Sequence, residues 1–97
     1  MNATQLQLRI EGWLREHDLL DRDLHFYNRE AWCERGEQYG RTADLTLTLD
    51  GAMLYDVVHS SSFAVTHDAF VEFLATLGYW YEIGYMWSMH LYPTETT

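Results

Sequence analysis

The sequence predicts a single small α+β domain, with helices packed on one side of a mostly antiparallel sheet. The chain has 97 residues, which is enough for one hydrophobic core and too few for two. Hydrophobic residues make up 47% of it, a composition typical of folded proteins. Apolar residues recur at helical spacing in some segments and alternate as in strands in others. The predicted order is helix, strand, short helix, two strands, helix and one long strand.

The first element is predicted to be a helix that begins near Thr4. Thr4 and Gln7 have the spacing of a capping box, in which each side chain hydrogen-bonds the backbone N–H of the other residue. Apolar residues then follow at helical spacing and form one stripe: Leu6, Ile10, Trp13 and Leu14. We expect this helix to end between His17 and Leu20.

A short strand and a short helix are predicted next. Residues 24–27 alternate as in a strand. Asn28 is expected to cap a helix over residues 29–35, and Gly36 to end that helix in a left-handed conformation. Trp32 is the expected contact of this helix with the core.

Residues 43–50 have the clearest strand pattern in the chain. Apolar residues alternate there with Asp and Thr, so we expect one face to be buried and the other to face solvent. Asp50-Gly51 favours a two-residue hairpin turn, because a type I′ turn needs a positive φ at both central positions. Residues 53–59 are the expected return strand, and a short helix over the same residues is the alternative.

A second long helix is predicted to begin near Thr66 and to end at Gly78. Thr66 is the expected N-cap, and Val65 is expected to pack on Phe70 as a hydrophobic staple. The apolar stripe of this helix has helical spacing: Phe70, Phe73, Leu74 and Leu77.

The last element is predicted to be one long strand over residues 79–91. Every odd position in it is apolar, and the alternation continues through Gly84, where we expect a bend. A hairpin is less favoured because Ile-Gly is poor turn chemistry. The even positions are not cleanly polar, because Trp80, Met86 and Tyr92 lie among Glu82, Ser88 and His90. A strand with apolar residues on both faces is either covered on both sides or contributes to an interface. The expected interface residues are Trp80, Met86, His90 and Tyr92, and a homodimer through this strand is one expected outcome.

The charge of the chain excludes several functions. There are 15 acidic residues against six arginines and no lysine, which gives a net charge of −9. All six arginines lie within residues 1–41, whereas residues 42–97 contain seven acids and no base. A lysine-dependent active site is therefore impossible, and no basic stripe for nucleic acid can form. We expect no direct contact with nucleic acid.

The sequence contains no motif that indicates catalysis, a cofactor or a metal centre. The five histidines lack His-x-x-x-His spacing, the glycines are dispersed, and the single cysteine, Cys33, lies among glutamates that disfavour its thiolate. The absence of a signal-like start and of a long apolar segment, together with this lone cysteine, predicts a cytoplasmic protein with no membrane contact.

The favoured hypothesis is a non-enzymatic protein-binding module whose acidic surface docks on a basic, nucleic-acid-handling partner. The expected contact residues are Asp44, Asp50, Asp56, Asp68, Glu72 and Glu82. In size and charge alone the chain is similar to small inhibitors carried by mobile elements, including anti-CRISPR and antirestriction proteins. That similarity implies an inhibitor of bacterial or phage origin. The alternative hypothesis is a small-ligand or metal-binding protein that uses His59, His67 and His90 with nearby carboxylates.

Overall fold

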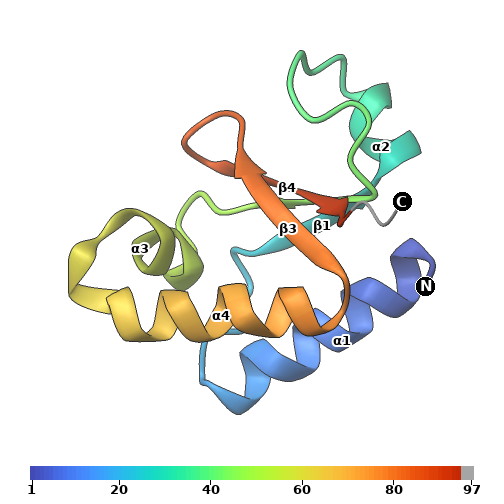
Figure 1. Cartoon of the computed structure of the whole chain (residues 1–97). Coiled ribbons are helices and arrows are strands. Elements are labelled where there is room, and N and C mark those ends of the chain that lie inside the picture. Colours follow the sequence, from blue (N-terminus) through green and yellow to red (C-terminus); the bar gives the residue numbers. More distant parts are fainter. Residues whose placement is uncertain (95–97) are drawn as a thin grey trace.

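A computed structural model describes residues 1–94 and confirms the α+β fold class (Figure 1). In chain order the elements are α1 (Ala3–Glu16), β1 (His25–Asn28), α2 (Arg29–Glu34), β2 (Leu45–Thr48), α3 (Met53–His59), the 3-10 helix η1 (Ser61–Phe63), α4 (Ala64–Thr76), β3 (Tyr79–Ile83) and β4 (Ser88–Pro93). The strands lie in the order β1-β2-β4-β3, and all neighbouring pairs are antiparallel.

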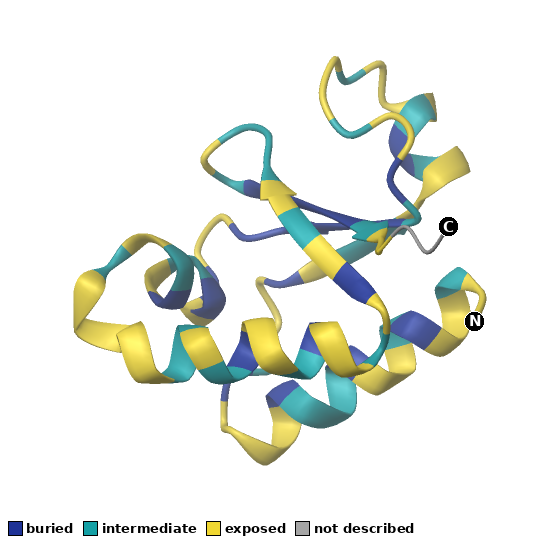
Figure 2. Ribbon diagram, viewed as in Figure 1, coloured by how far each residue is buried: buried dark blue, intermediate teal, exposed yellow. Residues whose placement is uncertain are grey.

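The sheet has one apolar face and one polar face. Three helices, α1, α3 and α4, lie on the same side of the sheet and cover its apolar face (Figures 1 and 2). The sequence predicts this arrangement for all helices, and α2 is the exception. The buried side chains of this core include Leu6, Ile10, Leu14, Leu45, Leu47, Leu54, Val57, Phe70, Leu74, Met89 and Leu91. The short helix α2 lies on the opposite face, where the Trp32 ring packs 5.4 Å from the ring of His90.

Helix α1 forms where predicted but begins with a different cap. Asn2 accepts the backbone N–H of Gln5 at 2.9 Å, and the Gln5 side chain accepts the N–H of Asn2 at 2.9 Å. The capping box predicted at Thr4 and Gln7 is therefore wrong by two residues, because Asn2 offers the same chemistry earlier in the chain. The prediction for α2 is confirmed. Asn28 accepts the N–H of Ala31, Trp32 is fully buried, and Gly36 has a φ of 77°.

Strand β2 is buried on both faces, and the expectation of a solvent-facing polar side is wrong. Thr46 and Thr48 are 1% and 7% exposed. The strand lies between β1 and β4, and α2 with the loop behind it covers the polar face at this position. Alternation in the sequence marked the two faces correctly, but it carried no information about this second layer.

Residues 53–59 form helix α3, so the return strand predicted after Asp50-Gly51 is wrong and the helical alternative is confirmed. Gly51 does have a positive φ of 81°. Both neighbours of β2 come from elsewhere in the chain, which leaves no place beside it for a return strand. Asp21 accepts the N–H of Met53 at 2.8 Å and caps the first turn of α3 from a distant loop.

Helix α4 begins at Ala64, ahead of the predicted cap at Thr66. Val65 is 85% exposed, so the predicted staple onto Phe70 does not form. The 3-10 turn η1 runs directly into the helix and replaces a side-chain cap. The end of α4 is as predicted, since Gly78 has a φ of 81°.

Residues 79–93 form a hairpin of β3 and β4, and the predicted single long strand is wrong. Ile83 pairs with Met89 and Tyr81 with Leu91, so residues of equal parity lie opposite each other on one face. A turn of this length leaves the odd-even pattern unbroken, which is why alternation could not reveal it. The turn is held by Ser88, whose hydroxyl accepts the N–H of Tyr85 at 2.8 Å.

Candidate functional site

One of the six acidic residues predicted for partner binding has a structural role. Asp44 is half-buried and accepts hydrogen bonds from Arg29 Nη2 and from the Tyr79 hydroxyl, each at 2.7 Å. Burial and the neighbouring Asp44 carboxylate raise the pKa of Tyr79 to about 12. Asp44 thus joins the start of α2 to the start of β3, so its carboxylate is already engaged within the molecule, and its assignment to a partner surface stays a prediction.

The other five acidic residues are exposed: Asp50, Asp56, Asp68, Glu72 and Glu82. Helix α3 carries Asp56, and the adjacent α4 carries Asp68 and Glu72 one turn apart on the same side of the helix. Exposed apolar side chains lie on the same two helices, with Met53 at 50%, Val65 at 85% and Val71 at 41% exposure. The name α3–α4 surface is used below for six residues: Met53, Asp56, Val65, Asp68, Val71 and Glu72.

Three of the six arginines form ion pairs or hydrogen bonds on other parts of the molecule. Arg29 pairs with Asp44, Arg35 with Glu37, and Arg41 donates to the backbone carbonyl of Glu37. Within residues 1–94, no arginine forms an ion pair with a carboxylate of the α3–α4 surface, and His67 Nδ1 lies 3.7 Å from Asp68 Oδ1. The carboxylates of this surface therefore remain largely uncompensated.

The predicted interface residues separate in the structure. Trp80 and Tyr92 lie opposite each other on β3 and β4, with ring centroids 5.2 Å apart, and Trp80 is 46% exposed. Met86 is exposed in the turn between these strands. His90, the fourth predicted interface residue, is 1% exposed and is not accessible to a partner in this structure.

His90 is buried inside a polar network on the covered face of the sheet. Its Nδ1 lies 2.9 Å from the Thr46 hydroxyl, and its Nε2 lies 2.9 Å from the Ser88 hydroxyl. Burial lowers the pKa of His90, so the ring is held neutral. Ser88 and His90 are residue types of a nucleophile and a base, but both are fully buried and hold the sheet together.

Two glycines allow the chain to close over this histidine. A Cβ atom on Gly40 would overlap the His90 ring, and a Cβ on Gly84 would overlap both that ring and Tyr39. The loop after α2 and the turn between β3 and β4 therefore approach His90 from separate sides. Sequence reasoning missed this role, because Gly40 is distant from His90 in the chain and no local pattern shows that the histidine is buried.

The three histidines of the ligand-binding alternative do not converge. His59 Nε2 lies 2.7 Å from the Met86 carbonyl, His67 Nε2 contacts the Tyr81 hydroxyl, and His90 lies inside the sheet network. In the described part of the chain, no three side chains of the metal-binding types form a group. A metal site at these residues therefore has no geometry to support it.

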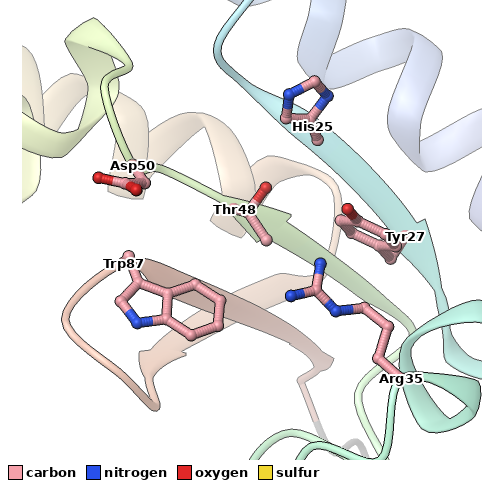
Figure 3. A pocket seen from close by; sticks show the side chains of 6 residues that line it. All are labelled: His25, Tyr27, Arg35, Thr48, Asp50 and Trp87. Atoms are coloured by element: carbon pink, nitrogen blue, oxygen red, sulfur yellow. The ribbon is translucent and has the colours of Figure 1, made fainter.

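A pocket that the sequence did not reveal lies at the open end of the sheet's polar face (Figure 3). Its volume is about 320 Å³, and it is lined by His25, Tyr27, Arg35, Thr48, Asp50 and Trp87. The Arg35 guanidinium lies 5.0 Å from the ring centroids of Tyr27 and Trp32, and 5.9 Å from that of Trp87. We call this site the sheet pocket. No local sequence motif indicates this pocket, because its residues come from four separate segments of the chain.

Comparison of the chain with protein-family models, with curated proteins and with solved structures found no match. Among residues 1–94, no helix has both the length and the apolar character needed to cross a bilayer.

Proposed function

We propose that this protein is a non-enzymatic binding module that docks its α3–α4 surface on a basic, nucleic-acid-handling partner and thereby inhibits it. The observation that carries the proposal is the group of exposed carboxylates on α3 and α4, in a half of the chain that contains no arginine or lysine. Such a surface attracts a basic protein at long range and speeds encounter.

The apolar side chains of the same surface support a specific contact. Val65 and Val71 stand exposed beside Asp68 and Glu72 on α4. A stable interface combines a desolvated apolar centre with polar groups around it, whereas a surface that serves solubility alone needs only the charges. The mixture on α4 therefore favours docking.

The test is affinity purification of the tagged protein from its source cells, at about 50 mM and about 500 mM salt. The variant Asp56→Asn/Asp68→Asn/Glu72→Gln neutralises the α3–α4 surface. The matched control Glu16→Gln/Asp18→Asn/Glu34→Gln changes the net charge by the same amount at exposed sites elsewhere. We expect a basic partner that high salt releases, and that the first variant loses while the control retains it. Equal retention by both variants, or binding that is indifferent to salt, would contradict the proposal.

We also propose, separately from the docking of the α3–α4 surface, that the protein self-associates through the hairpin of β3 and β4. Strand β4 lies between β2 and β3, so β3 is the part of the predicted last strand that lies at a sheet edge. An edge strand offers backbone N–H and C=O groups to a second copy, and Trp80 stands exposed on this one. Sedimentation velocity should detect a dimer that Trp80→Ser weakens and that Leu8→Ser, an exposed change on α1, leaves intact. A monomer at all concentrations would refute it.

A further inference from the structure

We propose that the sheet pocket binds a small zwitterion with a flat side chain, of the chemical class of a free aromatic amino acid. The proposal concerns residues that do not belong to the α3–α4 surface and does not depend on that surface. It rests on the charges, the aromatic ring and the hydroxyl that the pocket brings together.

The pocket has a cation on one side and an anion on the other. Figure 3 shows the Arg35 guanidinium and the Asp50 carboxylate on opposite sides, with Thr48 between them and the Trp87 ring below. A ligand that carries both an ammonium and a carboxylate group can place each of them against its opposite charge. The Thr48 hydroxyl adds a hydrogen-bonding group midway.

Contacts with neighbouring side chains restrict the orientation of Arg35. Glu37 Oε2 lies 3.1 Å from both Nε and Nη2 of Arg35, which leaves Nη1 for an incoming carboxylate oxygen. The faces of Tyr27 and Trp32 pack on the same guanidinium. Because few rotamers remain to be lost on binding, the arginine is better prepared for a carboxylate than a freely moving surface side chain.

Trp87 provides the surface on which a flat side chain can stack. Tyr85 covers the indole in a parallel stack, with centroids 4.7 Å apart and an interplanar angle of 3°. The ring also lines the pocket, beside the guanidinium. Offset stacking of a ligand ring on this indole adds affinity beyond simple burial of area.

The surrounding charges favour a zwitterion over other ligands. Asp50 and the net charge of −9 repel phosphates and other anions. A cation is disfavoured because the positive Arg35 guanidinium lies close to the Tyr27 and Trp87 rings and repels it. A zwitterion carries no net charge and so avoids both penalties. The volume of about 320 Å³ suits a ligand at the small end of the range for binding sites.

The test uses three related probes: phenylalanine, phenylacetate, which lacks the ammonium group, and phenethylamine, which lacks the carboxylate. Binding is followed by amide and indole N–H signals in two-dimensional NMR of the full chain. We expect phenylalanine to bind with a dissociation constant on the order of 1 mM. Its shifts should centre on Thr48, Asp50 and the Trp87 indole, and either truncated probe should bind about three- to tenfold more weakly.

Two variants test which side chain binds each charged group of the ligand. Asp50→Asn should remove the advantage of phenylalanine over phenylacetate, and Arg35→Gln its advantage over phenethylamine. Arg22→Gln and Asp18→Asn are the matched controls at exposed positions outside the pocket, and both should bind like the wild type. If a thermal melt shows that Arg35→Gln does not fold, Arg35→Lys, which keeps the charge but loses the planar fork, should weaken phenylalanine binding by a similar factor.

Several outcomes would overturn the proposal. The first is an absence of shifts at the pocket at about 10 mM phenylalanine, which is about ten times the expected dissociation constant. The second is equal binding of all three probes. The third is equally tight binding of glucose, which would indicate a polyol site. Failure of this test leaves the α3–α4 proposal untouched, because its triple variant changes no residue of the sheet pocket.

Discussion

The hydroxyl of Thr46 lies 2.9 Å from Nδ1 of His90, which joins β2 to β4 through two fully buried polar side chains. The other ring nitrogen of His90 lies equally close to the Ser88 hydroxyl. In the described part of the chain, every buried side-chain polar atom has a hydrogen-bond partner. The polar face of the sheet therefore carries a layer of buried, hydrogen-bonded side chains. The sheet pocket opens at the edge of this layer.

The first prediction concerns the dependence of stability on pH. Burial lowers the pKa of His90 below its ordinary value of 6.5. As pH falls below about 6.5, the unfolded chain takes up this proton first, so the free energy of unfolding decreases until the pKa of the folded state is reached. Urea unfolding at about pH 7.5 and about pH 5.5 measures the decrease. We expect a smaller decrease in His90→Gln than in the wild type. An identical decrease in both proteins would show that the carboxylates and the other histidines account for all of it.

Gly40→Ala is expected to lower the free energy of unfolding by about 2–4 kcal/mol, because the new Cβ overlaps the His90 ring and the backbone φ is 74°. Gly36→Ala is the matched control, with a φ of 77° and open space around its Cβ position. It should lower the same quantity by about 1–2 kcal/mol through backbone strain alone. Equal losses in chemical denaturation would mean that the loop moves away from His90 without cost.

Asp44→Asn should lower the pKa of Tyr79 from about 12, because two of the three influences that raise it come from the Asp44 carboxylate. Tyr79 keeps its proton longer in the folded state than in the unfolded chain. The wild type therefore loses stability as pH rises from about 10 toward about 12. Ultraviolet absorbance of tyrosinate during an alkaline titration measures the shift, with Tyr79→Phe used to assign the signal. Titration of Tyr79 at the same pH in both proteins would show that burial alone is responsible.

Asp21→Ala is expected to cost about 1–2 kcal/mol of stability, since it removes the acceptor for the N–H of Met53 at the start of α3. Asp21→Asn retains an oxygen at this position and should recover a large part of the loss. Asp23→Ala, two residues along the same loop, should change stability by less than about 0.5 kcal/mol. Thermal unfolding of the three variants gives the comparison, and a similar loss in all three would contradict a specific cap.

Local sequence patterns predicted the elements whose signals lie within a few neighbouring residues. Asn28 with Gly36 bounded α2, the apolar stripe identified α1, and Gly78 ended α4, because caps and positive φ angles are properties of short segments. The uneven distribution of charge, on which the partner hypothesis depends, is likewise a property of the amino-acid sequence itself.

Other features of the protein depend on contacts between residues that are distant in the chain, and the tertiary structure alone decided them. Residues 53–59 form a helix because β1 and β4 pair with the two sides of β2 and because Asp21 caps the first turn of that helix. Local alternation cannot distinguish a long strand from a hairpin whose turn preserves parity, nor a solvent-facing threonine from one under a second layer. Contacts between distant residues bury His90, pair Asp44 with Arg29 and bring the residues of the sheet pocket together. The sequence by itself determined the fold class, the limits of α2, the end of α4 and the sign of the charge in each half, whereas long-range packing decided which polar side chains are buried and which remain free to bind.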